Sequence, residues 1–366
     1  MSGRIRLGIV GAGAIAENAH IPAALSSNLA ELTALSETNQ SRLRYLQQKF
    51  SLKHEVCFVD YRDVFTRADA VIIALPNHLH ASLGCEFLSR SIHVLCEKPL
   101  ATSVQECETM LEASRSTGAV LAVGYYTRFF SSTNLLKRLL ETRLLGTISS
   151  FEYEFGTEGG WAPLSGYNLT RQTAGGGVLV VSGSHFIDRM LYLFGPTRIL
   201  SYKDDAHGGV EANCVASFDC QDSGNSVEGH VTLSKTHRLS NKLRIVGANG
   251  TFEVAEGQSE SVAYYPRDSD LRHEISFTSP ITGSAGDDHF KMEIEDFIRA
   301  IRTGGKPMVN GQEGTESVAL IEECYSIAQP IDEPWVDQSL KLIMGSIPPL
   351  DKSVGTRGTI QEFLGN

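Results

Sequence analysis

The stretch Arg4-Ile-Arg-Leu-Gly-Ile-Val-Gly11-Ala-Gly13-Ala-Ile-Ala16 decides the fold of the first part of this chain. Its apolar run predicts a buried strand, which leads into a G-x-G-x-x-A turn and then into a helical pattern. Gly11 permits the tight turn, Gly13 lets a pyrophosphate approach the backbone, and the small Ala16 allows the helix to pack closely on the strand. The free amide groups at the start of the helix suit phosphates. The stretch therefore predicts a dinucleotide site.

Outward from this stretch, short apolar runs alternate with stretches of helical spacing. The predicted strands are 7–10, 32–35, 70–75, 92–96 and 120–123, and the predicted helices are 15–25, 41–50, 81–89 and 104–116. Apolar strands separated by helices are typical of right-handed βαβ crossovers, which build a parallel sheet covered on both faces. We predict one α/β domain with a doubly wound parallel sheet over residues 1–123.

After Tyr125, strands follow one another without helices between them. The predicted strands are 149–155, 215–218, 226–234, 242–246, 251–254 and 261–265, and the predicted helices are 134–143, 177–194, 288–303 and 316–328. Successive strands joined by Gly, Asn and Asp turns favour antiparallel pairing. We predict a C-terminal α/β domain over residues 124–366, with a mostly antiparallel open sheet and a tail of unpredicted structure beyond Pro330.

Composition narrows the classes of function. Among 366 residues, Lys and Arg number 32 and Asp and Glu 43, a net charge of −11 without runs of like charge. Such a chain is unsuited to nucleic acid and to anionic membranes. The seven cysteines include no C-x-x-C pair, and the histidines show no spacing typical of metal ligands. We find no signal peptide and no apolar run near the ~20 residues that a membrane span needs. We predict a cytoplasmic protein without a metal.

The second predicted strand ends at Glu37, 24 residues after Gly13. An acidic residue at about this spacing accepts from the ribose 2′-hydroxyl of NAD. Glu37 would repel the 2′-phosphate of NADP, and neither of its immediate neighbours is Arg or Lys. We therefore predict NAD, with NADP less favoured. The alternative is a solvated loop carboxylate.

The next two predicted strands end in loops with polar side chains. Pro76, Asn77 and His80 follow one strand, and Glu97 and Lys98 follow the other. The carboxyl ends of parallel strands are where such sheets bind ligands. Beside a nicotinamide and partly buried, Lys98 would have a pKa lowered enough to exchange protons. The alternatives are structural histidines and a surface lysine.

Together these motifs resemble those of the Gfo/Idh/MocA family, the relatives of glucose–fructose oxidoreductase and inositol dehydrogenase. The resemblance rests on the glycine turn, Pro76-Asn77-x-x-His80 and Glu97-Lys98-Pro99, and it continues to about residue 329. It implies a Rossmann domain for NAD(P) and an α/β domain that forms the substrate wall and often an oligomer interface, here of a homodimer or homotetramer. It also implies reversible oxidation of a sugar or cyclitol hydroxyl, with Lys98 at the reacting oxygen.

The helix predicted over 177–194 carries a second candidate group, His185. In the family the position four residues earlier is commonly Asp, which forms an Asp/His pair near the reacting hydroxyl. Here that position is Val181, so the usual two-residue relay is incomplete, although the histidine is present. Asp188 lies one turn further on and fits either a substrate contact or a structural hydrogen bond.

A loop before this helix and one arginine complete the substrate candidates. Trp161, Tyr167 and Arg171 combine aromatic faces with a cation, which suits a sugar, and Arg128 matches a frequent arginine of the family. Each also fits a residue packed on its own domain. The predicted cofactor residues are Gly11, Gly13, Ala14, Ile15, Glu37, Pro76, Asn77, His80, Glu97 and Lys98, and the predicted substrate residues are Lys98, Arg128, Trp161, Tyr167, Arg171, His185 and Asp188.

We predict an NAD-dependent dehydrogenase that oxidises a hydroxyl of a sugar, sugar derivative or cyclitol, with Lys98 as general acid/base assisted by His185. Two alternatives stay open. The same scaffold hosts NAD-assisted hydrolysis or elimination with transient oxidation, which cofactor retention without net NADH formation would favour. A non-catalytic NAD-sensing binder is the other, since fold does not fix function. The presence of both Lys98 and His185 argues against that binder.

Overall fold

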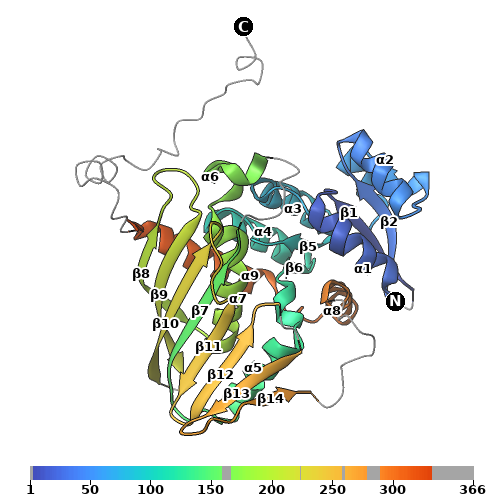
Figure 1. Ribbon diagram of the computed structural model, residues 1–366. Helices are drawn as coiled ribbons and strands as arrows, with labels where there is room; N and C mark the ends of the chain where they lie inside the picture. The colour runs from blue at the N-terminus through green and yellow to red at the C-terminus, as the bar shows by residue number, and fades with distance from the viewer. Residues whose placement is uncertain (1–2, 159–165, 223, 258–259, 278–288, 332–366) are drawn as a thin grey trace.

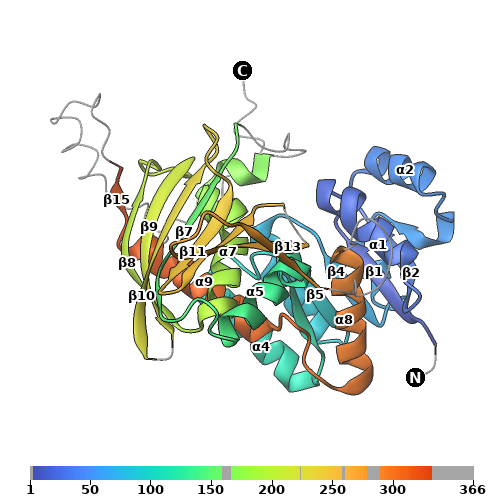
Figure 2. The ribbon, with the colours of Figure 1, turned by 60° about the horizontal axis from the view of Figure 1, so that its bottom comes forward.

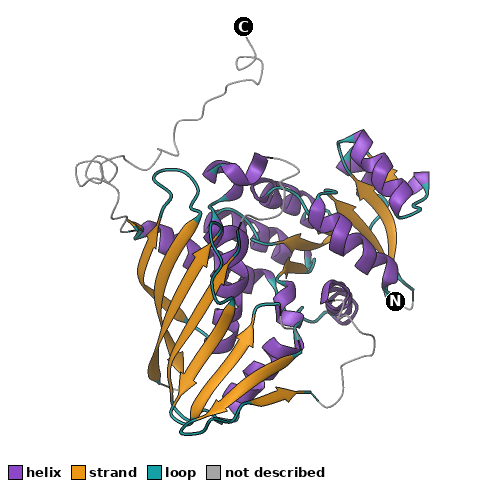
Figure 3. Ribbon diagram, viewed as in Figure 1, coloured by secondary structure: helices purple, strands orange, loops and turns teal. Residues whose placement is uncertain are grey.

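A computed structural model describes residues 3–158, 166–222, 224–257, 260–277 and 289–331. It contains two sheets with helices between and around them (Figures 1 and 3). Within the described ranges, no helix is both long enough and apolar enough to cross a membrane.

The first sheet is the predicted doubly wound parallel sheet. Its strands are β1 (Ile5–Val10), β2 (Ala30–Ser36), β3 (Cys57–Phe58), β4 (Ala70–Ile73), β5 (His93–Glu97) and β6 (Leu121–Gly124). They lie in the order β3-β2-β1-β4-β5-β6 and all pair in parallel. The order changes direction at β1, so ligands are expected at the carboxyl ends of β1 and β4. The sequence analysis missed β3, because two residues are too few to show a period.

Helices from both ends of the chain cover this sheet. A π-helical turn η1 (Ala16–His20) leads into α1 (Ile21–Ser26), and α2 (Gln40–Lys49), α3 (His80–Leu88) and α4 (Val104–Thr117) follow. Late in the chain, α8 (His289–Thr303) packs against α1, and its Ile294, Phe297 and Ile298 are buried in the core of this sheet. The boundary after residue 123 stays a prediction, and in space α8 covers the first sheet.

The second sheet is mostly antiparallel, as predicted. Its strands are β7 (Ile148–Gly156), β8 (Thr197–Asp204), β9 (Asn213–Asp222), β10 (Asn225–Ser234), β11 (Lys242–Gly247), β12 (Gly250–Ala255), β13 (Ser261–Pro266), β14 (His273–Ser276) and β15 (Gln329–Pro330). The order is β14-β13-β12-β11-β7-β10-β9-β8-β15. Only the pairs β7–β10 and β8–β15 are parallel within the described part. The sequence analysis missed β8, whose side chains are mostly exposed, and the short β14 and β15.

One face of the second sheet is covered by helices. These are α5 (Ser131–Glu141), α7 (Ser184–Phe194), which continues the π-helical turn η7 (Leu179–Gly183), and α9 (Gly311–Ser326), while the short α6 (Arg171–Ala174) contacts the first domain. Figure 2 shows α5, α7 and α9 between the second sheet and the first domain. The start predicted for the last helix, residue 316, was wrong, because Asn310 and Glu313 form a capping box that begins α9 at Gly311.

Candidate active site

The glycine turn after β1 has the shape that a dinucleotide requires. Gly11 has a φ of +92°, and a Cβ at this position would press on the carbonyl oxygen of Ala74. A Cβ on Gly13 would meet no atom within 4 Å, so the outer side of this turn is open. The turn leads directly into a helix that begins at Ala14, ahead of η1, and the amides at such a helix start have no partner within the helix. The turn therefore fits the phosphates of a dinucleotide.

Glu37 lies beside this turn. Its carboxylate accepts hydrogen bonds from the amides of Ala12 at 3.1 Å and Asn39 at 2.8 Å. The sequence analysis missed Arg42, whose guanidinium donates to the carbonyl oxygen of Ala12 at 2.8 Å and pairs with Glu17 at 2.5 Å. Glu17 is shared by Arg42 and by Lys49, whose ammonium lies 2.6 Å from it, while no cation of the described chain forms an ion pair with Glu37. Glu37 therefore places an unpaired carboxylate at the ribose side of the site.

The loop after β4 is fastened on two sides. The ring nitrogens of His80 lie 2.8 Å from the carbonyl oxygens of Leu75 and Pro99, and burial lowers the pKa of His80. The amide of Asn77 donates to the carbonyl oxygen of Ala174 at 2.8 Å, across to the second domain. Both side chains are buried. Asn77 and His80 therefore hold the loop after β4 against the segments of Pro99 and Ala174. That Pro76, Asn77 and His80 contact the cofactor stays a prediction.

Lys98 lies where β5 ends, and its Nζ donates to the carbonyl oxygen of Val181 at 2.7 Å. Val181 belongs to η7, and π-helical turns disrupt the regular backbone bonding of a helix. The π-helical turn therefore leaves the backbone carbonyl of Val181 able to accept from Lys98. Burial lowers the pKa of Lys98, Glu97 raises it, and the positive charge of Lys235 lowers it further. The net result is a lysine that gives up its proton more readily than usual.

Glu97, the last residue of β5, fixes the backbone of Lys98. Its carboxylate accepts from the backbone amide of Lys98 at 3.0 Å and lies 2.7 Å from Nε2 of His20. Burial raises the pKa of Glu97, but the hydrogen bond from His20 and the charges of His20 and Lys98 outweigh this effect and hold that pKa below its usual value. His20, in η1, carried no signal in the sequence. Glu97 is predicted to be a cofactor residue, and in the structure it fixes the backbone of Lys98.

His185 approaches Lys98 from α7. Its ring packs edge-on against Tyr126, with centroids 5.0 Å apart, and its Nδ1 is buried without a hydrogen-bond partner in the described chain. Burial lowers the pKa of His185 well below its usual value, and the charges of Lys98 and Arg189 lower it further. The imidazole is therefore neutral at pH 7. It can accept or donate a hydrogen bond at a substrate hydroxyl without carrying charge.

Arg128 and Asp188 form a pair in the interior. The guanidinium donates to both carboxylate oxygens at 2.7 and 2.8 Å, and the side chains are 2% and 0% exposed. Arg128 also pairs with Glu313 at 3.1 Å. This pairing joins α7 and α9 to the segment after β6 and favours a structural role. The predicted substrate contact of both residues stays a prediction.

The loop before η7 places its candidates differently. Tyr167 is partly buried, and burial raises its pKa, as does the charge of Glu97. Arg171 is exposed and lies over the ring of Tyr325 at 4.3 Å, so the structure does not bring it to Lys98. Trp161 lies outside the described residues.

Glu211, which the sequence analysis missed, holds the start of η7. Its carboxylate accepts from the amides of Gly177 at 2.8 Å and Leu179 at 3.0 Å and from the hydroxyl of Tyr325 at 2.7 Å. A Cβ on Gly177 would press on the backbone of Glu211, so only glycine fits. The glycines before His185 therefore allow close packing as well as a helix start. No local pattern could reveal a partner 34 residues away.

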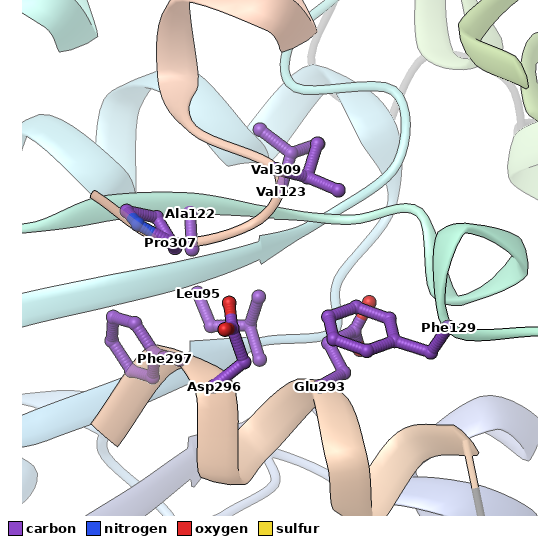
Figure 4. A pocket seen from close by; sticks show the side chains of 9 residues that line it. All are labelled: Leu95, Ala122, Val123, Phe129, Glu293, Asp296, Phe297, Pro307 and Val309. Atoms are coloured by element: carbon purple, nitrogen blue, oxygen red, sulfur yellow. The ribbon is translucent and has the colours of Figure 1, made fainter. Parts of the chain in front are cut away.

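A pocket lies between α8 and strands β5 and β6 (Figure 4). Its lining comprises Leu95, Ala122, Val123, Phe129, Glu293, Asp296, Phe297, Pro307 and Val309. Glu293 is 3% exposed, and neither of its carboxylate oxygens has a hydrogen-bond partner in the described chain. Burial, together with the charges of Glu97 and Asp296, raises the pKa of Glu293 well above its usual value. Glu293 therefore holds its proton to a higher pH than an exposed glutamate does.

The Glu293→Gln variant is expected to gain stability relative to the parent protein as pH rises. Glu293 keeps its proton in the folded chain and releases it on unfolding. Its folded pKa is raised, so the free energy of unfolding falls above the ordinary pKa by about 1 kcal/mol per pH unit, until the folded pKa is reached. Gln has no proton to release. Urea unfolding at several pH values measures the difference, with Glu316→Gln, an exposed site, as control. Parallel pH curves for parent and Glu293→Gln would contradict the prediction.

The fold and the site define a class: a two-domain α/β protein with the glycine turn of a dinucleotide site and a lysine of lowered pKa at the carboxyl edge of its parallel sheet. Residues 5–125 match the model of an oxidoreductase family with an NAD-binding Rossmann fold, and residues 137–333 match that family's C-terminal alpha/beta domain. The chain therefore belongs to the Gfo/Idh/MocA oxidoreductase family, which confirms the resemblance and an NAD(P)-dependent oxidoreductase.

Relatives with known names span most of the chain. The rhizopine catabolism protein MocA of Rhizobium meliloti is 26% identical over 329 residues, 87% of this chain and 92% of MocA. A D-xylose 1-dehydrogenase (NADP(+)) of Haloferax volcanii is 26% identical over 330 residues, 88% of this chain and 97% of that protein. A 3-ketoreductase from Actinomadura kijaniata, solved with NADP and TDP-benzene, shares the fold with a TM-score of 0.78 at 21% identity, covering 90% of this chain and 99% of that one.

Proposed function

We propose that this protein is an NAD-dependent dehydrogenase of a sugar, sugar derivative or cyclitol, in which Lys98 is the general acid/base and His185 assists. The observation that carries the proposal is the position of Lys98. Its ammonium lies at the carboxyl end of β5, 2.7 Å from a backbone carbonyl, and its pKa is lowered. A lysine with a lowered pKa is suited to take a proton from an alcohol as the alcohol is oxidised.

Different residues would bind the cofactor, accept the proton and orient the substrate. Gly11, Gly13 and Glu37 would hold the dinucleotide, and its nicotinamide, when bound, supplies the acceptor for the hydride. Neutral Lys98 accepts the hydroxyl proton while the carbon loses hydride, so the alcohol becomes a carbonyl. Neutral His185 orients the same hydroxyl by a hydrogen bond. Glu97 and His20 keep Lys98 in place throughout, since both are fixed by the contacts described above.

One screen separates this proposal from its alternatives. Sugars, uronates, amino sugars and inositols are each supplied with NAD, and NADH formation is followed by its absorbance. Net NADH with at least one compound supports the dehydrogenase. Cleavage or elimination of a glycoside with retained cofactor and no net NADH would favour the redox-assisted hydrolase or eliminase. Cofactor binding without any turnover would favour the NAD-sensing binder.

NAD is expected to bind at least about 10-fold more tightly than NADP, a difference of about 1.4 kcal/mol. Glu37 repels a 2′-phosphate, and Arg42 is already bound to Glu17 and to the carbonyl oxygen of Ala12. Calorimetric titration of both cofactors measures the ratio. Glu37→Gln should narrow it, whereas Glu31→Gln, exposed on β2, should leave it as it is. Equal affinities in the parent protein would contradict the assignment of Glu37.

We also propose a cytoplasmic protein that forms a homodimer or homotetramer through the second sheet. The support is the sheet face opposite α5, α7 and α9, where alternate side chains of β8 and β10 are exposed. Light scattering after gel filtration measures the mass in solution. A monomer at micromolar concentration would contradict the proposed assembly.

A further inference from the structure

Lys235 follows β10 directly and lies at the edge of the second sheet that borders the Lys98 site. The last residue of β10, Ser234, pairs with Gly156 at the end of β7, since these two strands are parallel. The amide of Lys235 donates to the carbonyl oxygen of Ala212 at 2.8 Å. Ala212 adjoins Glu211, which holds the start of η7, and η7 carries the carbonyl that binds Lys98. A short chain of contacts thus links Lys235 to Lys98, through the backbone of Ala212, the carboxylate of Glu211 and η7.

The carboxylates around this edge are already committed to other partners. Glu211 accepts three hydrogen bonds, from two backbone amides and the Tyr325 hydroxyl. Glu97 binds His20 and a backbone amide. Glu256 pairs with Arg189 at 2.9 Å, and Asp188 pairs with Arg128. None of these groups forms an ion pair with Lys235 or Lys98.

The positive charges of Lys235 and Lys98 are therefore not compensated by a carboxylate in an ion pair within the described residues. The side chain of Lys235 is partly buried, and its ammonium has no hydrogen bond or ion pair with any residue that the structure describes. Burial lowers the pKa of Lys235, and Glu211 raises it. Lys98 binds only a backbone carbonyl through its ammonium. Burying a cation without a counter-ion lowers the stability of the folded protein. Lys235 is such a cation, although the chain has a net charge of −11.

We propose that Lys235 forms an anion subsite, which binds the carboxylate or phosphate of a sugar derivative whose hydroxyl reacts at Lys98. An anion at this position supplies the missing counter-ion and orients the substrate by one charged contact. A neutral sugar of the same shape would leave the ammonium unpaired, and such a mismatch lowers kcat/KM. The catalytic half of this statement rests on the proposed function, whereas the binding half does not.

The first experiment compares matched substrates on the full-length protein with NAD. The pairs are D-glucuronate with D-glucose, and D-glucose 6-phosphate with D-glucose, which separate carboxylate from phosphate. At least one anionic sugar is expected to have a kcat/KM at least about 10-fold above that of glucose, and Lys235→Met should reduce this preference by about 10- to 100-fold, mainly through KM. Lys235→Arg should retain most of it. Lys203→Met, exposed on β8, makes the same change in net charge and should leave the preference as it is.

The second experiment measures binding without turnover. Calorimetry on the protein saturated with NAD compares D-glucuronate and D-glucose 6-phosphate with D-glucose, at low and high salt. The proposal expects at least one anion to bind more tightly than glucose, with an affinity that falls with salt and with Lys235→Met. If binding follows this pattern while no sugar is oxidised, the anion subsite stands and the proposed dehydrogenase fails. If glucose binds as well as both anions, or if Lys235→Met binds them like the parent protein, the subsite is wrong.

Discussion

Replacing Lys98 with methionine is expected to lower kcat by about 10²- to 10⁴-fold, the range for loss of a general acid/base. Methionine keeps much of the length and apolar volume of the lysine stem but can neither accept the hydroxyl proton nor donate to the carbonyl of Val181. Affinity for the cofactor should change little, because the glycine turn and Glu37 hold the other end of the dinucleotide. Turnover with a substrate identified by the screen and calorimetric titration of NAD measure the two effects.

The pH profile gives this prediction a second readout. A base must be neutral to act, so kcat/KM rises with pH through the pKa of Lys98, which is lowered from its ordinary value. Lys98→Met should abolish that limb. As a comparison within the same site, His185→Ala should cost only about 10- to 100-fold, because a neutral histidine orients rather than titrates. A larger loss at His185 than at Lys98 would show that the histidine is the principal base.

The sequence predicted the parts of the fold whose pattern repeats locally. Buried parallel strands such as β4 are continuous apolar runs, and the amphipathic spacing of α8 shows its buried face. The missed elements lack such a signal. β8 has only two buried residues, and a register shift between Ile199 and Ser201 interrupts its alternation. The first turn of α9 depends on a cap, Asn310 with Glu313, rather than on apolar spacing.

In the candidate site, too, the residues of local motifs were predicted and the residues outside such motifs were missed. Gly11 and Lys98 belong to motifs that the chain carries in one short stretch, and these motifs pointed to their positions. Glu211 and Lys235 reach the site from segments far away in sequence, so only the folded topology brings them there. Arg42 lies five residues after Glu37 but belongs to no motif. Local chemistry is readable from local sequence, whereas the electrostatic environment of that chemistry depends on tertiary contacts.

Val181 shows how the two levels combine. The sequence reveals a missing carboxylate, and the resemblance alone suggests a weakened proton relay. In the structure the backbone carbonyl of the same residue binds Lys98, a contact that does not depend on the side chain. Burial lowers the pKa of His185 well below its usual value, and Val181 supplies no carboxylate to oppose this effect. A neutral His185 fits our proposal that Lys98 is the proton acceptor.

The second large effect is expected at the buried pair of Arg128 and Asp188, where Asp188→Ala should cost about 3–5 kcal/mol in the free energy of unfolding. The loss arises because Arg128, 2% exposed, would keep its charge without the carboxylate that faces it at 2.7 and 2.8 Å. Burial raises the pKa of Asp188 to about 6, so measurements above that pH compare a charged pair with a lone cation.

Matched variants separate the charge from the packing at this pair. Urea unfolding of Asp188→Ala is compared with Arg198→Ala, which breaks an ion pair with Asp219 whose arginine side chain is 72% exposed and should change stability by less than about 1 kcal/mol. The double variant Arg128→Met with Asp188→Leu removes both charges and should recover part of the loss, since no buried charge is left unpaired. If Asp188→Ala lowers the free energy of unfolding no more than Arg198→Ala does, then water or Glu313 is a sufficient partner for Arg128. That result would contradict the structural role and would favour a substrate contact for Arg128 and Asp188.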